Sequence, residues 1–434
     1  MGTSGQNDLT VHLDVLNNHV HRRSPMSAQL PLYQVIHQRI GAALPHSTPL
    51  SSITRLALLV TGMLAARSAV IAQIAAELQA LRLTRASTPE SIARRLRRTL
   101  NDPHLDQPTC YAPVLHQVLD WDDLLRGQRR IVLIVDESSK ADDLHLFRVS
   151  LPYWGGSLPL AWCLWQQNVP LPDGFYWRAV DTVLDQVAQL LPAGLEVVVV
   201  ADRAYGIPPF VDRLTRRGWH WVLRLTTTGS HRWCDQHGHE HALREVLRQH
   251  LRQPGQRYRA RGCLFKDAGW RKVELVGVWG EGQKEMLVVV TDLRERWSVL
   301  ALYNRRFWIE PGFRTDKKKG WQWEACQVVG VEHHERLLLG MAWASLVTLV
   351  VGVEAAADEK ERLARRKWRK ALPQVRHARE SVFTLGLRAM REWLYHATRC
   401  ALRWVLSKLD APSWERQWHQ YQSLRLIFGS PVRP

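Results

Sequence analysis

Cysteine is scarce in this sequence, and its thiols follow no pairing pattern. Six cysteines occur in 434 residues, and none stands in a Cys-x-x-Cys motif. This scatter favours reduced thiols in a cytoplasm over the disulfide framework of a secreted domain. The chain also lacks a Gly-x-x-x-x-Gly-Lys-Ser/Thr phosphate loop, so nothing in it supports a nucleotide hydrolase.

Long apolar runs are rare too. The amino terminus, MGTSGQNDLTVHLDVL, lacks the basic segment and apolar core of a secretory signal. Only residues 337–353 approach the ~20 apolar residues that a membrane span needs. The polar flanks, HHER before the run and EAAADEKE after it, favour a buried helix that packs on a sheet. We therefore expect no membrane among the partners.

What the chain does have is positive charge. Its 59 Lys and Arg residues against 41 Asp and Glu give a formal net charge of +18. This excess indicates an acidic partner, with nucleic acid the first candidate. An acidic membrane surface competes, but the basic residues are spread along the chain rather than gathered in one cluster. Most of the 20 tryptophans are expected in the core, with some free to stack on bases.

Two apolar runs end on an aspartate. RRIVLIVDES contains Asp136, and LEVVVVADRAYG contains Asp202. Runs so rich in Val and Ile predict strands that are buried on both faces. If the strands are parallel neighbours, about 4.8 Å apart, the two aspartates can share a metal ion at the carboxyl ends of the strands. Acids at strand ends are also ordinary turn residues or helix caps.

A third acid lies in the stretch LYNRRFWIEPGFRTDKKKGW. On an ideal helix Tyr303, Arg306, Glu310 and Lys317 fall within roughly 60° of one face. The carboxylate could then hold a metal ion, the two cations could hold phosphate oxygens, and the tyrosine could stack or donate a hydrogen bond. A solvated basic helix is the competing interpretation.

Pro311 directly follows Glu310 and complicates this helix. A proline inside a helix costs about 3 kcal/mol. Either the helix kinks there, or a new helix begins with Pro311 in its first turn. The single-face argument therefore holds strictly only as far as Glu310.

In this order, Asp136, Asp202 and Glu310 resemble the acidic triad of the DDE transposases of bacterial insertion sequences. The spacing of Tyr303, Arg306, Glu310 and Lys317 resembles the Tyr-Arg-Glu-Lys signature of one cut-and-paste branch. The likeness covers roughly residues 50–355. It implies an α/β fold in which an RNase H-like catalytic core carries a β-rich insertion before the catalytic Glu. An all-α N-terminal domain and a helical C-terminal region would flank this core.

The resemblance also implies a chemistry: strand cleavage and transfer with two Mg²⁺ ions, or Mn²⁺ in their place. We expect Asp136 to bridge both ions, and Asp202 and Glu310 each to hold one. Excision in this branch passes through a hairpin with a flipped base. Tyr303, Arg306 and Lys317 are then expected on the DNA backbone at the cleaved end.

Three further residues are candidates for contacts to that DNA end. Trp279 and Trp308 are candidates to stack on the flipped base, although a chain so rich in tryptophan places most of them in its core. Arg203, directly after Asp202, could reach a phosphate or pair with an acid.

The resemblance and the local patterns together predict a domain layout. Within residues 126–225 we expect the strands IVLIVD, LHLFRVSLPY, LPLAWCLWQ, EVVVVAD and WHWVLRL, with a helix at 175–191 and a short one from Pro208. In the insertion we expect YRARGCLFK, WRKVELVGVW and EMLVVVTDL. The expected parts are a loosely ordered arm (1–48), a helical DNA-end-binding domain (49–125), the core (126–225 and 299–357), the insertion (226–298) and a basic helical region (358–434).

Three helices are expected between residues 51 and 100, from apolar residues at three- and four-residue intervals. Ser87 and Glu90 match a capping box, with Pro89 in the first turn of the last helix. That helix carries a run of arginines that could read DNA through the major groove. A helical bundle with a solvated arginine face is the alternative. The arginines are Arg94, Arg95, Arg97 and Arg98.

The segment HRWCDQHGHEH, residues 231–241, collects zinc-ligand residue types within the insertion. Its spacing matches no usual zinc module, and a polar loop is the alternative.

Three function classes remain open: an active transposase, a DNA-binding regulator derived from one, and a two-metal nuclease without strand transfer. The intact triad with its companions favours the first. By analogy we expect a homodimer on double-stranded DNA, both transposon ends and target, in the cytoplasm at the nucleoid.

Overall fold

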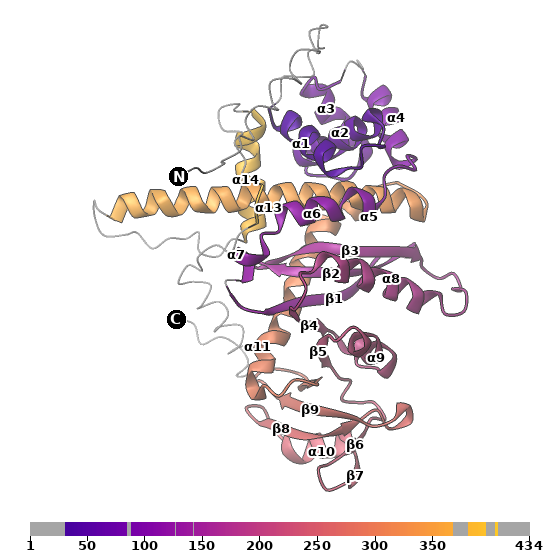
Figure 1. The fold of residues 1–434 in the computed structure, drawn as a ribbon, viewed down its shortest axis with the longest axis vertical. Helices are drawn as coiled ribbons and strands as arrows, with labels where there is room; N and C mark the ends of the chain where they lie inside the picture. The colour runs from indigo at the N-terminus through magenta and orange to yellow at the C-terminus, as the bar shows by residue number, and fades with distance from the viewer. Residues whose placement is uncertain are drawn as a thin grey trace, which may run out of the picture.

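The computed structural model describes residues 31–84, 88–125, 127–141, 143–367, 381–395 and 404–406. Its framework is one mixed sheet of ten strands in the order β3-β2-β1-β4-β5-β10-β9-β8-β6-β7. Figure 1 shows this sheet below a cluster of N-terminal helices. The strands are β1 (Arg130–Lys140), β2 (Leu144–Tyr153), β3 (Gly156–Gln166), β4 (Glu196–Ala201), β5 (His220–Arg224), β6 (Arg232–Cys234), β7 (Glu240–Ala242), β8 (Arg257–Leu264), β9 (Arg271–Val278) and β10 (Leu287–Thr291).

The first five strands form the part of the sheet that carries two of the predicted acids. Strands β1, β2 and β3 are antiparallel neighbours, whereas β4 pairs parallel with β1 and β5 parallel with β4. Two helices make the crossovers that parallel pairing requires, α8 (Phe175–Leu190) and α9 (Pro208–Arg216). The five strands and both helices lie in the segments where the sequence analysis expects them.

The segment expected as a β-rich insertion does contain the three predicted strands, β8, β9 and β10. They continue the same sheet, because β10 pairs antiparallel with β5. The segment also contains a helix that the sequence analysis did not predict, α10 (Leu243–His250). Leu243, Val246 and Leu247 are its buried residues, and their three- and four-residue intervals are the signal that predicts a helix.

Seven helices precede the sheet in the described part of the chain. The first corrects the expected loose arm over residues 31–43, because Leu32, Ile36 and Ile40 recur every four residues and are fully buried. Residues 1–30 of that arm lie outside the described residues. The helices are α1 (Pro31–Ala43), α2 (Leu50–Ala66), α3 (Ile71–Ala80), α4 (Pro89–Leu100), α5 (Gln107–Cys110), α6 (Ala112–Val118) and α7 (Trp121–Leu125).

The long apolar run forms the core of helix α13 (Val331–Lys367), which lies between the N-terminal helices and the sheet (Figure 1). Its most apolar part, Val331–Ala357, has the length and hydropathy of a membrane span, but 94% of an apolar 18-residue window within it is buried inside the molecule. It packs against α2 and β3, as the sequence predicts for a buried core helix. Of the basic C-terminal region, the structure describes the end of α13, helix α14 (Val382–Tyr395) and residues 404–406.

Candidate active site

Asp136 and Asp202 occupy matching positions on neighbouring parallel strands. The register pairs Val135 of β1 with Ala201 of β4, so the two aspartates follow at the same level of the sheet. Asp202 also caps the 3₁₀ turn η2 (Arg203–Tyr205), because its Oδ1 accepts a hydrogen bond of 2.9 Å from the backbone of Ala204. A turn-capping role and a place beside Asp136 are thus combined in one residue.

Glu310 reaches the same place from a helical segment whose geometry changes along its length. Helix α11 (Val299–Asn304) runs into the 3₁₀ turn η5 (Arg305–Trp308), then helix α12 (Ile309–Arg314) and the π turn η6 (Thr315–Lys319). Pro311 is the third residue of α12, so a new helix begins just before it and the proline stands in its first turn. Because 3₁₀ and π turns change the rotation per residue, the four signature residues do not share one ideal helix face.

A single guanidinium brings the three acids together. Arg306 Nη2 lies 3.1 Å from an Asp136 carboxylate oxygen and 3.9 Å from one of Asp202, and Nη1 lies 2.7 Å from one of Glu310. Because the three carboxylate oxygens contact one guanidinium, they lie less than ~10 Å from one another. A larger separation would be too long for the short oxygen–metal bonds of a shared site. The structure therefore assembles Asp136, Asp202 and Glu310 at one place.

The environment of Asp136 penalises its negative charge. The pKa of Asp136 is raised to about 6, chiefly by burial and also by the nearby Asp202 and Glu310 carboxylates, while Arg306 opposes the shift. Burial also raises the pKa of Tyr303 to about 12, so this phenol keeps its proton at neutral pH. The site thus concentrates negative charge that a nearby cation stabilises.

The donor set suits a hard divalent cation, which prefers carboxylate oxygens. Across the described residues, however, no three His, Cys, Asp or Glu side chains are arranged to hold a metal ion as they stand. The Arg306 guanidinium lies between the three carboxylates instead. The three carboxylates are suitable ligands for the implied metal, provided that the Arg306 side chain moves away from them.

The remaining signature residues differ in how close they lie to the acids. Tyr303 is 1% exposed, and it lies near enough to Asp136 and Asp202 for their charges to contribute to its raised pKa. The Lys317 ammonium lies 3.7 Å from Glu324, outside the group held by Arg306, because the π turn carries it past the acids. Arg203 lies 3.8 Å from Glu285, as in the acid-pairing alternative.

The two tryptophans predicted to stack on a base also differ. Trp308 is only 7% exposed, which corrects the stacking prediction in favour of the core alternative. Trp279 is partly exposed and donates a hydrogen bond of 3.0 Å to the backbone oxygen of Gln283. Sequence reasoning missed Trp297, which is 37% exposed with the Arg257 guanidinium 5.6 Å from its ring centre.

A buried ion pair that the sequence did not reveal supports helix α12. Arg148 of β2 stands opposite Asp136 in the antiparallel register, and its Nη1 lies 2.5 Å from an Asp316 oxygen. The same guanidinium lies over the Phe313 ring at 4.3 Å. Arg148 therefore ties the sheet beside Asp136 to the segment that carries Glu310.

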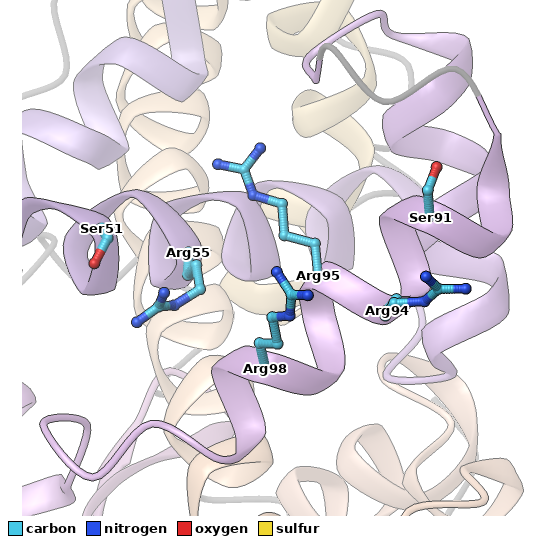
Figure 2. A pocket seen from close by; sticks show the side chains of 6 residues that line it. All are labelled: Ser51, Arg55, Ser91, Arg94, Arg95 and Arg98. Carbon is cyan, nitrogen blue, oxygen red and sulfur yellow. The ribbon is translucent and has the colours of Figure 1, made fainter.

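A second basic feature lies in the N-terminal helices. A hollow of about 470 Å³ opens between α2 and α4, and Figure 2 shows the arginine side chains around it. Arg55 pairs with Asp102, whereas no acid within the described parts of the chain forms an ion pair with the three arginines of α4 in the hollow. Arg97 is exposed on the same helix but does not line the hollow. The lining residues are Ser51, Arg55, Ser91, Arg94, Arg95 and Arg98.

The start of α4 differs slightly from the expected capping box. Thr88 is the N-cap, and its hydroxyl accepts a hydrogen bond of 3.3 Å from the backbone of Ser91. Pro89 stands in the first turn as predicted. Ser87 lies outside the described residues.

The histidine-rich segment folds as the hairpin of β6 and β7. At its turn the Asp235 carboxylate accepts hydrogen bonds of 2.8 and 2.9 Å from the backbones of His237 and His239. No three metal-ligand side chains are arranged to hold a metal ion here, in a stretch that the structure describes throughout. These backbone hydrogen bonds are those of a polar hairpin turn.

A comparison with known families covers the second half of the site. Residues 178–347 match the family described as Transposase DDE domain. The match spans Asp202 and Glu310, whereas Asp136 precedes it. No curated protein matches the chain. The match supports a transposase, and the large mixed sheet with its many helices is consistent with the fold of one.

Proposed function

We propose that this protein is a DNA transposase that cleaves and transfers strands at the ends of an insertion sequence. The observation that carries the proposal is the convergence of Asp136, Asp202 and Glu310 on one guanidinium. These acids come from two adjacent strand ends and a distant helix, the order in which the acidic triad of such enzymes occurs. The match of residues 178–347 to a transposase domain supports the same conclusion.

The topology supports an RNase H-like core for this chemistry. Three antiparallel strands are followed by a helix and two parallel strands, in the spatial order β3-β2-β1-β4-β5. The first and fourth strands are neighbours in this order, and this adjacency sets Asp136 beside Asp202. On this proposal the strands after β5 form the insertion that precedes the catalytic glutamate.

Asp136, Asp202 and Glu310 would hold the divalent ions, Mg²⁺ or Mn²⁺. Two such ions activate the attacking hydroxyl and stabilise the leaving oxygen of a phosphodiester. The chain's own contribution is the placement of three carboxylates around one cation, the Arg306 guanidinium. Arg306 offsets part of the negative charge of the acids in the free protein. In the proposal it transfers to a backbone phosphate when DNA enters, since a guanidinium binds phosphate as well as carboxylate.

DNA is the partner that the charge distribution suits. The net charge of +18 and the arginine-lined hollow of α2 and α4 fit a phosphate backbone. We therefore propose residues 49–125 as the part that binds the transposon end. Two subunits would act on two ends, and Trp297, with its exposed ring, is the better candidate to stack on a flipped base if excision passes through a hairpin.

The test uses linear DNA that carries the inverted repeats flanking the reading frame, incubated with the protein and Mg²⁺. The proposal predicts nicks at the repeat ends, a hairpin product on a denaturing gel, and joining to a target plasmid. Binding of the repeats without any metal-dependent nick would indicate a DNA-binding regulator instead. Nicking of any DNA without end preference or joining would indicate a nuclease.

A further inference from the structure

The residue after Asp136 carries a hydrogen-bonded cluster on the opposite face of the sheet. The Glu137 carboxylate accepts a hydrogen bond of 2.6 Å from the Tyr176 hydroxyl and one of 2.7 Å from the Tyr205 hydroxyl, both on Oε1. A ring nitrogen of His145 lies 2.5 Å from the other oxygen. Three donors from three different elements thus meet on one carboxylate that is only 24% exposed.

One of these donors belongs to the turn that Asp202 builds. Asp202 caps η2 through the backbone of Ala204, and Tyr205 is the last residue of that turn. Tyr205 is 2% exposed, with its ring 6.2 Å from Phe147 and 4.7 Å from Phe210. Because the ring is packed on both sides, the hydroxyl cannot change its partner without moving the turn.

The other end of the connection is Asp136. Successive side chains of a strand point to opposite faces, so Asp136 faces Arg306 while its neighbour Glu137 faces Tyr205. The backbone N–H of Glu137 also donates a hydrogen bond of 3.0 Å to the Asp136 carboxylate. A continuous path therefore runs from Asp202 through its turn to Tyr205, from Tyr205 to Glu137, and from Glu137 to Asp136.

We infer that Tyr205 and Glu137 are positioning residues that set the separation between the Asp136 and Asp202 carboxylates. The inference rests on the proposed function, in which these two acids hold a divalent ion. The parallel backbone pairing of β1 and β4 ends at Val135 and Ala201, one residue before the acids. The Tyr205–Glu137 hydrogen bond ties the two strand ends together beyond that point.

The molecule offers a matched control, because Tyr176 donates to the same Glu137 oxygen from helix α8. Both tyrosines are buried enough for burial to raise their pKa well above its usual value. Only Tyr205 belongs to the turn that Asp202 caps. Tyr205→Phe and Tyr176→Phe therefore each remove one hydroxyl and one hydrogen bond to Glu137, but they differ in what the bond positions.

The experiment measures Mn²⁺ binding by electron paramagnetic resonance, with the full chain bound to a duplex that carries the flanking repeat. Tyr205→Phe is expected to weaken Mn²⁺ binding by about 10–100-fold, the usual effect of losing a residue that orients metal ligands. Tyr176→Phe is expected to bind Mn²⁺ close to wild type. Gel-shift affinity for the duplex should be unchanged in both variants, and both should melt near the same temperature.

Equal Mn²⁺ affinity in the two variants overturns the inference, whether both lose it or both keep it. A second pair of variants, at Glu137, tests the inference if Tyr205→Phe fails to fold. Glu137→Ala removes the shared acceptor and should lose Mn²⁺ affinity, whereas Glu137→Gln keeps an acceptor oxygen and should restore most of it. Wild-type affinity in Glu137→Ala overturns the inference as well.

Failure of the proposed function would look different. If the wild-type complex with the flanking repeat bound no Mn²⁺ and cut no DNA, the metal-dependent transposase itself would be wrong. If the wild type bound Mn²⁺ and cut DNA while Tyr205→Phe did both equally well, only the positioning role would fall.

Discussion

Arg306 donates a hydrogen bond of 3.1 Å to Asp136, a residue 170 positions earlier in the chain. The pair is largely buried, with 14% of the arginine side chain and 11% of the aspartate side chain exposed. The arginine thus holds the position that a cation needs among the acids. On the proposed function, metal ions and Arg306 would compete for the same carboxylates in the absence of DNA.

The Arg306→Ala variant tests this competition. Without the guanidinium, the three acids lose their counter-ion, and burial with like charges makes an external cation more favourable. We expect Mn²⁺ to bind DNA-free Arg306→Ala at least about tenfold more tightly than DNA-free wild type, which corresponds to ~1.4 kcal/mol. Isothermal titration calorimetry with Mn²⁺ alone measures the difference. End cleavage should fall in the same variant, because the phosphate loses its partner.

Arg314→Ala is the control for that experiment. Arg314 is exposed at the end of α12, and its substitution removes the same charge outside the acid cluster. It should leave Mn²⁺ affinity unchanged. If Arg314→Ala raised the affinity as much as Arg306→Ala, general electrostatics rather than direct competition would explain both.

The arginine-lined hollow predicts a localised DNA-binding surface. Substituting Arg94, Arg95 and Arg98 with Gln should weaken binding to the repeat duplex, because these three arginines line the hollow. For each phosphate that the variant no longer neutralises, the slope of log K against log salt should shrink by about 0.9. Fluorescence anisotropy over a range of salt concentrations measures both quantities.

Two single variants give that prediction its control. Arg97→Gln removes an equal charge from the same helix outside the hollow, and it should change the slope less than Arg98→Gln does. Identical slopes for Arg97→Gln and Arg98→Gln would show that the helix acts through its net charge and not through the hollow.

The burial of Glu335 on α13 leads us to predict that the stability of the protein depends on pH. Burial raises the pKa of Glu335 to about 7 from 4.5, although the backbone of Leu164 donates a hydrogen bond of 2.9 Å to it. The folded form therefore keeps a proton that the unfolded form loses above pH 4.5. Stability is lost as pH rises from 4.5 towards 7 and is then level.

The Glu335→Gln variant should remove this loss. It keeps an acceptor for Leu164 and carries no charge, so it should gain up to about 3 kcal/mol over wild type at pH 8.5 and little at pH 4.5. Urea unfolding at the two pH values measures the gain. Glu332→Gln, one turn away and exposed, should show no such difference. A Glu335→Gln variant that is less stable than wild type at pH 8.5 would contradict the prediction.

Helix α12 approaches β3 so closely at Gly312 that we predict no larger residue fits there without a shift. A Cβ atom at this position would lie 2.5 Å from the Ser157 hydroxyl and 3.2 Å from the Arg148 guanidinium. Gly312→Ala should therefore push α12 outwards, cost about 1–3 kcal/mol of stability and slow end cleavage by displacing Glu310. Thermal unfolding and a cleavage assay measure the two effects.

Two further variants bear on the Gly312 prediction. Gly156→Ala meets nothing closer than 3.7 Å and should be nearly neutral. Adding Ser157→Ala to Gly312→Ala should recover part of the loss, because it removes the nearest clashing atom. No recovery in the double variant would mean that the clash with Ser157 is not the cause.

Much of the sheet could be predicted because buried strands carry an unambiguous pattern. The runs before Asp136 and Asp202 are continuous apolar segments dominated by Val and Ile, and both form central strands. Helix α1 was missed although Leu32, Ile36 and Ile40 recur every four residues, because polar residues, His and Pro surround them. Periodicity was present there, but composition obscured it.

The site was predictable in part. The order and residue types of the acids predicted their meeting, whereas the central place of Arg306 depends on where η5 crosses the sheet. The position of Lys317 depends on turns that are not α-helical, so spacing along an ideal helix does not place it. The Glu137 cluster lies on the other face of β1, where the only signal was a second acid next to Asp136.

The most direct test of the account compares single-substitution variants of the three acids in end cleavage with Mg²⁺. Wild type should nick the repeat ends in Mg²⁺ and not in EDTA. Asp136→Asn, Asp202→Asn and Glu310→Gln should each slow nicking at least about a thousandfold, an activation cost of ~4 kcal/mol, and still bind the duplex. Normal nicking by Asp136→Asn would contradict the account.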